Sequence, residues 1–192
     1  MSKLDDLRKH LKAGKVYRRA ELAQWSSAVD RHARLLVEEC ALEKLAQGLY
    51  YVPKKTVFGT APPDEETLVR SFLKDDHFLL TSPNAYNSLG VGTAQLYNKR
   101  VVYNHKRHGD FKLGGRNFTF HAKPRFPSKV TQEFLLVDLV NNLESLAEDR
   151  EMILKNVIAK AMTMEESKLK GAVMNYGSTR AKALFATIIL KS

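Results

Sequence analysis

Between residues 26 and 38, the apolar positions recur with the period of an α-helix. They stand at positions i, i+4, i+7 and i+8, and they are Val29, Ala33, Leu36 and Val37. The face opposite this stripe is charged, and the two serines that precede it, Ser26 and Ser27, favour a serine N-cap. The pattern predicts an amphipathic helix that begins near Ser27 and presents a polar face to solvent.

Residues 42–53 show the alternation typical of strands, interrupted once by Gln47-Gly48. Polar residues separate two leucines before this pair, and the return segment 49–52 is rich in aromatic and branched residues until Pro53 ends it. The pattern predicts a tight β-hairpin directly after the helix. Cys40 lies at the junction between the two elements, where we expect a small buried side chain.

The segment before residue 26 predicts an amphipathic helix over 4–11, a short strand at 16–17 and a short helix over 19–25. The complete order is therefore helix, strand, helix, helix and hairpin. This order is typical of a winged helix-turn-helix, a module in which the helix after the turn lies in a DNA groove. The helix that begins near Ser27 would be that recognition helix.

A change of pattern near residues 53–66, with Gly59, Pro62 and Pro63, indicates a domain boundary, and Asp64 suits the cap of a following helix. Beyond it we expect helices over 65–74, 81–89, 130–143, 148–161, 165–175 and 178–190, and strands over 100–103, 111–113 and 117–121. The predicted fold class is α+β. It comprises a winged helix-turn-helix at 1–55, a linker at 56–66 and a mixed α/β domain at 67–192 with a small antiparallel sheet and a helical C-terminal end.

The net charge of +10 is unevenly distributed over the 192 residues. Residues 1–60 carry 12 basic and 7 acidic residues, whereas residues 99–129 carry 9 basic residues and 1 acidic residue. The first block coincides with the predicted helix and hairpin, where attraction to phosphates would supply non-specific affinity for DNA. The second is either another nucleic-acid surface or a dock for an acidic protein. Its cations include Lys99, Arg100, Lys106, Arg107, Lys112, Arg116, Lys123 and Arg125.

Polar side chains of the predicted module are candidate DNA contacts, either with base edges or with phosphates. On the recognition helix they are Ser27, Arg31, His32 and Arg34. At the start of the preceding helix they are Arg18 and Arg19, and on and behind the hairpin they are Lys44, Gln47, Lys54 and Lys55.

The sequence offers little catalytic chemistry. His105, His108 and His121 resemble a metal cluster, but Lys106 and Arg107 beside the first two disfavour a bound cation. We therefore expect no catalytic residue, no metal and no cofactor. The single cysteine and the absence of a signal-peptide core or a long apolar run favour a cytoplasmic location.

The hairpin motif Leu42-Glu43-Lys44-Leu45-Ala46-Gln47-Gly48-Leu49-Tyr50-Tyr51-Val52-Pro53 resembles the wing of the AbiEi-like antitoxins of bacterial type IV toxin–antitoxin systems. Weaker similarity extends over 79–90, 101–103, 114–120 and 176–184. Two positions depart from the family pattern, because Cys40 stands at a usual glycine and Leu35 at a usual arginine. Arg31 or Arg34 would then replace the DNA contact of that arginine.

The resemblance implies a phage-defence antitoxin that binds repeats in its own promoter through the winged helix and represses its operon. It also implies an AbiEii-like nucleotidyltransferase toxin as the partner, opposed by the C-terminal domain or indirectly. We expect a monomer or weak dimer that binds double-stranded DNA and no membrane. Two alternatives remain: a stand-alone regulator without a toxin, and, less favoured, an enzyme that acts on nucleic acid through residues 99–129.

Overall fold

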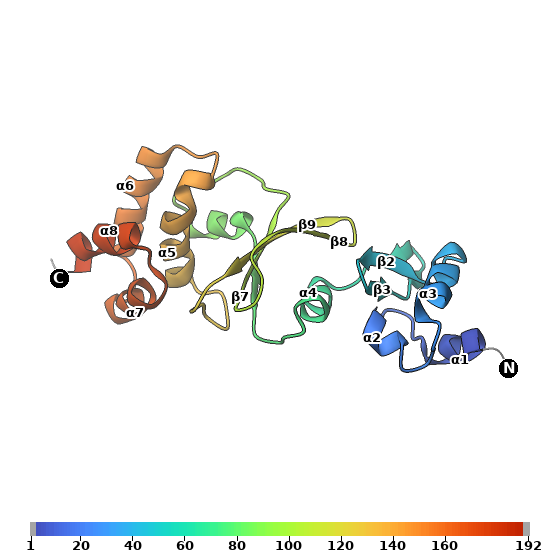
Figure 1. Cartoon of the computed structure of the whole chain (residues 1–192). Coiled ribbons are helices and arrows are strands. Elements are labelled where there is room, and N and C mark those ends of the chain that lie inside the picture. Colours follow the sequence, from blue (N-terminus) through green and yellow to red (C-terminus); the bar gives the residue numbers. More distant parts are fainter. Residues whose placement is uncertain (1–2, 190–192) are drawn as a thin grey trace. The chain divides into compact units, whose positions relative to one another are not determined.

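The computed structural model describes residues 3–189 and has a mixed α+β fold (Figure 1). The chain divides into two compact units. The first comprises the chain up to Asp76 together with Asp110–Phe118, and the second comprises His77–Gly109 and the chain from Thr119 onward.

The first unit contains four helices and five short strands among the described residues before Asp76. The helices are α1 (Lys3–His10), α2 (Arg19–Leu22), α3 (Val29–Glu38) and α4 (Glu65–Leu73). The strands are β1 (Val16–Arg18), β2 (Glu43–Ala46), β3 (Leu49–Tyr51), β4 (Lys54–Thr56) and β5 (Gly59–Ala61). The predicted helices near 4–11, 19–25 and 27–38 are thus confirmed within a few residues, as is the hairpin after them.

Strands β1, β2 and β3 form an antiparallel sheet in the order β1-β3-β2. The β2–β3 turn is tight because Gly48 adopts a φ of 70°, which a residue with a side chain rarely adopts. One apolar cluster joins the three N-terminal helices to this sheet. Its buried members are Leu7, Tyr17, Leu22, Val29, Ala33, Leu36 and Leu42. The apolar stripe of α3 is therefore the inner face of the unit, and its polar face points outward.

Both junctions of α3 differ from the sequence expectation. The N-cap residue is Ala28 and carries no side-chain cap, because Ser26 is buried and its hydroxyl accepts a hydrogen bond from the amide of Ala28 itself. At the other end, Cys40 is exposed rather than buried. It has a φ of 57°, a left-handed conformation in which its side chain turns away from the core.

The segment predicted as a linker at 56–66 has regular structure. Strands β4 and β5 form a two-stranded antiparallel hairpin, and α4 begins directly after it. Asp64 caps α4 as predicted, with its carboxylate accepting a hydrogen bond from the Thr67 amide at 2.9 Å. The first compact unit continues to Asp76, so α4 is grouped with the N-terminal elements.

The second unit combines strands with a helical C-terminal end. Its strand and 3₁₀ segments are β6 (Leu79–Thr81), η1 (Pro83–Leu89), β7 (Arg100–Asn104) and η2 (Leu143–Ser145). Its α-helices are α5 (Gln132–Asn142), α6 (Arg150–Ala161), α7 (Glu166–Tyr176) and α8 (Thr179–Ile189). The four predicted C-terminal helices are confirmed, whereas the predicted helix over 81–89 is a 3₁₀ segment preceded by a strand.

Helix α5 lies at the centre of this unit, where it packs against η1, α6, α7 and α8 (Figure 1). Every residue from Phe134 to Val140 is buried, which is the pattern of a helix covered on all sides. Most of these residues are apolar, but the run includes Asp138. A buried carboxylate at this position needs polar partners.

Strands β8 (Gly109–Leu113) and β9 (Arg116–Ala122) complete a four-stranded sheet in the order β6-β7-β9-β8. The Gly114-Gly115 turn between them is confirmed, with φ values of 53° and 76°. The division between the two units passes through this hairpin. Its end, residues 110–118, is grouped with the first unit, and its base with the second.

Candidate nucleic-acid interface

The outward face of α3 carries two arginines and two acidic residues, which have different partners. Arg34 lies 3.7 Å from Glu38 one turn later, and Asp30 is held by Arg19 of α2. Arg31 is exposed, and it has no ion-pair partner among residues 3–189. The cation of α3 that is available to an incoming phosphate or base edge is therefore Arg31.

Ser27 is also exposed, just before α3 begins, and its hydroxyl accepts a hydrogen bond from the Lys3 ammonium at 2.9 Å. This contact adds a cation beside the N-terminus of α3. The backbone amides at a helix N-terminus attract anions, and Lys3 reinforces that attraction.

His32 does not belong to this face, and its place among the candidate contacts is corrected. Its exposed fraction is 5%, and its Nδ1 lies 2.7 Å from the hydroxyl of the buried Ser26. The reason is helical spacing, because His32 follows Val29 by three residues and therefore lies on the inner stripe. His32 and Ser26 close the N-terminal end of the core instead.

Arg18 and Arg19 are adjacent in sequence but have different surroundings. The half-buried Arg18 donates from Nε to the backbone oxygen of Ser71 in α4, at 2.5 Å, and its burial lowers the pKa of the guanidinium. Arg19 is exposed, and its backbone amide donates to the oxygen of Gly48 in the β2–β3 turn. Arg18 thus holds α4 in place, whereas Arg19 lies beside the turn and the start of α3.

The remaining candidates of the first unit are exposed and lie on its strands and turns: Lys44 in β2, Gln47 in the β2–β3 turn, and Lys54 and Lys55 in β4. Lys44 pairs in register with Tyr50 of β3, so the β2–β3 hairpin holds it on an ordered strand. Together with Arg31 and Arg19 these side chains form what we call the α3 surface. It has the exposed cations that binding to a phosphate backbone requires.

The residues of the second basic block are divided between the two units. Lys112 and Arg116 are grouped with the first unit, where Arg116 lies 3.2 Å from Glu65. Within the second unit, Lys123 is turned toward Asp138, and Arg125 donates to the side chain of Asn175. Lys99 immediately precedes β7, and Arg100 is the first residue of that strand. The guanidinium of Arg100 donates a hydrogen bond to the side-chain oxygen of Asn98.

Lys106 and Arg107 lie on the exposed loop after β7, and a buried asparagine orders this loop. The side-chain oxygen of Asn104 accepts hydrogen bonds from the amides of Lys106 and Arg107, at 2.8 and 2.6 Å. Its nitrogen donates to the backbone oxygen of Arg107 at 2.9 Å. The backbone conformation of this basic loop is therefore fixed, although both cations remain exposed.

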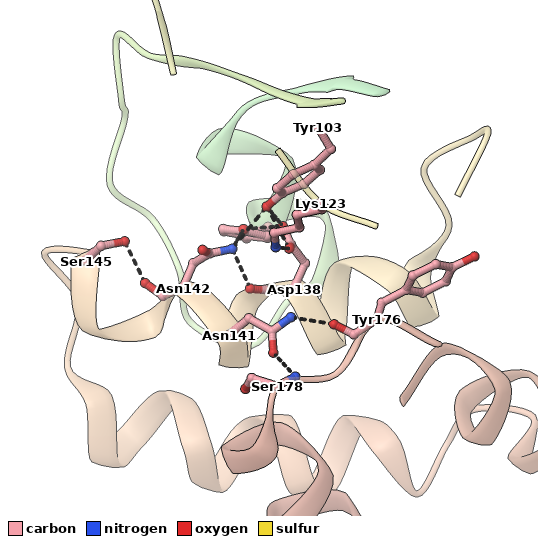
Figure 2. Close-up of polar contacts among 9 residues, drawn as sticks. Tyr103, Lys123, Asp138, Asn141, Asn142, Ser145, Tyr176 and Ser178 are labelled. Atoms are coloured by element: carbon pink, nitrogen blue, oxygen red, sulfur yellow. Dashed lines mark hydrogen bonds and ion pairs between the residues drawn. The ribbon is translucent and has the colours of Figure 1, made fainter. Parts of the chain in front are cut away.

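A buried polar centre surrounds Asp138 in the second unit, and the sequence reasoning did not identify it (Figure 2). The hydroxyls of Tyr86 and Tyr103 donate to its carboxylate, each at 2.7 Å. The amide of Asn142 donates to the backbone oxygen of Asp138 and approaches both tyrosine oxygens at 3.2 Å. The available signal was one carboxylate in an otherwise apolar helix, Phe134-Leu135-Leu136-Val137-Asp138-Leu139-Val140.

Burial dominates the electrostatics of this centre. It raises the pKa of Asp138, and the two tyrosine hydroxyls and Lys123 only partly oppose that effect. Burial, followed by the charge of Asp138, raises the pKa of Tyr103 and Tyr86 above the ordinary value for tyrosine. Both tyrosines are therefore neutral donors, and the centre joins η1, β7 and α5 through hydrogen bonds that lack solvent competition.

A cavity of about 60 Å³ lies beside the centre, lined in part by Tyr97, Lys99, His121 and Ser145. The polar groups of the centre are hydrogen-bonded to one another. We interpret the centre as a structural element. Among residues 3–189 no group of three potential metal ligands is assembled. His105 stacks on His77, and its ring lies 4.8 Å from that of Phe126 in a tilted arrangement.

No family model matches the chain, and neither a curated protein nor a solved structure matches it. In the described part of the chain, no helix has the length and apolar character required to cross a bilayer.

Proposed function

We propose that the protein is a DNA-binding antitoxin of the AbiEi-like type, which binds repeats in its own promoter and represses its operon. The observation that carries this proposal is the arrangement of the first unit. The element order α1-β1-α2-α3-β2-β3 and the strand order β1-β3-β2 fit a winged helix-turn-helix, with α3 as recognition helix and the β2–β3 turn as wing.

The charges of the α3 surface support the same function. Arg31 lies exposed in the first turn of α3, without an acidic partner among the described residues. Arg19 and the β2–β3 turn are joined by a backbone hydrogen bond of 2.9 Å, so phosphate-binding groups of α2 and the wing are positioned together. With this arrangement Arg31 would lie in the major groove of the DNA, and the flanking cations would contact the phosphates of the DNA backbone.

DNA binding is tested by titrating the full-length protein into duplex DNA from the region upstream of its own gene. We expect specific binding that weakens with salt, and a loss of about 1–3 kcal/mol in Arg31→Ala if Arg31 contacts a base. The matched control is Lys170→Ala, which removes an exposed cation from α7 in the other unit. Wild-type protein that binds this DNA no better than unrelated DNA would contradict the proposal.

The antitoxin role rests on the sequence resemblance, and it is tested separately. The adjacent nucleotidyltransferase gene, expressed alone, should arrest growth, and co-expression of this protein should restore it. If neutralisation proceeds through the C-terminal domain, Arg31→Ala should still restore growth when both genes are driven by a foreign promoter. Specific DNA binding without any protection would leave the protein as a stand-alone regulator.

A further inference from the structure

The hairpin formed by β4 and β5 ends in two apolar side chains that are almost fully exposed. Val57 is 93% exposed and Phe58 is 97% exposed, more than Leu96 at 84% or Met162 at 75%. We call these two residues the β4–β5 tip. A soluble surface tolerates single exposed apolar residues, but two adjacent ones at the end of a projecting hairpin favour a partner.

The tip is held by an ordered turn. The hydroxyl of Thr56 donates to the backbone oxygen of Gly59 at 2.7 Å and accepts from the amide of Phe58 at 3.3 Å. The hairpin is also fastened to the first sheet, because the hydroxyl of Tyr51 donates to the oxygen of Ala61 at 2.8 Å. The two apolar side chains are therefore presented from a braced support.

Turn chemistry does not explain the choice of these residues. Two-residue hairpin turns favour Asn, Asp or Gly, and the left-handed conformation of this turn falls on Gly59, with a φ of 105°. Val57 and Phe58 thus satisfy no requirement of the backbone, and among residues 3–189 they are left almost fully exposed. Their chemistry indicates what the hairpin contacts.

Four lysines lie in β4 or in the segment that hydrogen-bonds to the chain just before it. Lys54 and Lys55 belong to β4, and the Lys54 side chain lies against Gly14, with its Cδ 3.5 Å from the position that a Gly14 Cβ would take. Lys12 and Lys15 lie on either side of Gly14 in the sequence. All four lysines are exposed, and none has an ion-pair partner among residues 3–189. The partner must therefore offer negative charge around an apolar slot.

We propose that the β4–β5 hairpin is a second wing, whose lysines bind phosphates while the tip inserts between base pairs in the minor groove of the DNA that α3 contacts. Duplex DNA combines both required features, since phosphates border a groove whose base steps accept apolar wedges. The hairpin belongs to the same compact unit as α3 and the β2–β3 wing. This inference rests on the proposed function and adds a groove contact and a deformation of the DNA.

The test uses the double variant Val57→Ser/Phe58→Ser of the full-length protein, with Leu96→Ser as control for loss of an exposed apolar side chain in the other unit. Because the replaced side chains are almost fully exposed, the variant should fold, as an unchanged melting temperature verifies. Binding is measured on the upstream duplex over a range of salt, and 2-aminopurine in that duplex reports unstacking.

We expect the tip variant to bind at least tenfold more weakly with an unchanged salt slope, because Val57 and Phe58 release no counterions. The 2-aminopurine signal should disappear with it. Lys54→Ala/Lys55→Ala should instead lower the slope of log affinity against log salt by about two, at roughly 0.9 per lost phosphate contact. Leu96→Ser should behave as wild type in each measurement.

The outcomes separate the two proposals. If the wild type does not bind the upstream duplex specifically, the proposed function fails and the second wing fails with it. If Arg31→Ala weakens binding but the tip variant binds and unstacks DNA as wild type does, only the second wing is overturned. It is also overturned if the tip variant changes the oligomeric state, or loses binding to phosphatidylserine vesicles while DNA binding is intact.

Discussion

Asp30 holds the guanidinium of Arg19 at two points, with Nε–Oδ1 and Nη2–Oδ2 distances of 2.6 Å each. The pair connects the first turn of α2 to the first turn of α3. The hydrogen bonds from Arg19 lower the pKa of Asp30, and those to Asp30 raise the pKa of Arg19. A cation predicted to contact phosphate is therefore already paired with a carboxylate of α3.

Replacement of this carboxylate should strengthen DNA binding. In Asp30→Asn the guanidinium of Arg19 is released and a negative charge leaves the α3 surface, so affinity should rise and the salt slope should steepen by about 0.9. Titration on the upstream duplex at several salt concentrations measures both. Asp6→Asn, which removes an exposed acid from α1, is the control. Equal affinity and slope in wild type and Asp30→Asn would remove Arg19 from the interface.

Cys40→Gly should stabilise the first unit. Cys40 has a φ of 57°, which a β-carbon makes unfavourable, and glycine relieves this strain while losing only an exposed side chain. We expect a gain of about 1 kcal/mol in the free energy of unfolding, measured by urea titration. Cys40→Ala keeps the β-carbon and should show no gain. A Cys40→Gly protein no more stable than Cys40→Ala would contradict the strain argument.

The pH dependence of stability should carry the signature of Asp138. Because burial raises its pKa in the folded state, the folded protein holds this proton more tightly than the unfolded chain does. The contribution of Asp138 to the free energy of unfolding is greatest below the ordinary aspartate pKa. It declines as pH rises through the pKa that Asp138 has in the folded state. Hydrogen exchange of α5 amides measures this, and Asp138→Asn should abolish the decline.

Asp64 provides a control of opposite sign. Hydrogen bonds from Thr67 lower its pKa, so its contribution is present above the ordinary aspartate pKa and is lost as pH falls through the folded value. Asp64→Asn should therefore alter the pH dependence of stability on the acid side. Hydrogen exchange of the α4 amides measures this change. Identical pH profiles for wild type and Asp138→Asn would show that burial does not control the proton of Asp138.

Two glycines near the C-terminal end should respond oppositely to alanine. A β-carbon at Gly177 would lie 2.5 Å from the backbone oxygen of Val173, so Gly177→Ala should cost about 1–3 kcal/mol in the free energy of unfolding. At Gly171, within α7, nothing lies within 4 Å, and Gly171→Ala should gain about 0.5–1 kcal/mol from helix propensity. Chemical denaturation of both variants gives the comparison. Equal effects would contradict the close contact between Gly177 and the backbone oxygen of Val173.

Elements with a strong local pattern were predictable from the sequence. The stripe of α3 and the Gly114-Gly115 turn are encoded within a few residues, and both are present in the structure. The hairpin of β4 and β5 was missed because its strands are three residues long and lack apolar alternation. Strand β6 was missed because its partner β7 lies about twenty residues further along the chain.

The candidate sites show the same limit. Exposure of Arg31 followed from the helical period, and the same period, applied consistently, places His32 inside. The polar centre was beyond prediction because Tyr86, Tyr103 and Asp138 come from η1, β7 and α5, and only tertiary packing brings their side chains together. The basic block is divided between two units because the end of the β8–β9 hairpin is grouped with the first unit and its base with the second. Only the tertiary structure shows this grouping.

That hairpin determines how the molecule can be dissected. Since residues 110–118 are grouped with the N-terminal unit, the polypeptide passes from one unit to the other three times, after Asp76, Gly109 and Phe118. A single cut after residue 76 would leave the N-terminal fragment without residues 110–118, which are grouped with the first unit. Deletion mapping would then confuse unfolding with loss of function, so point substitutions in the intact chain are the appropriate genetic instrument.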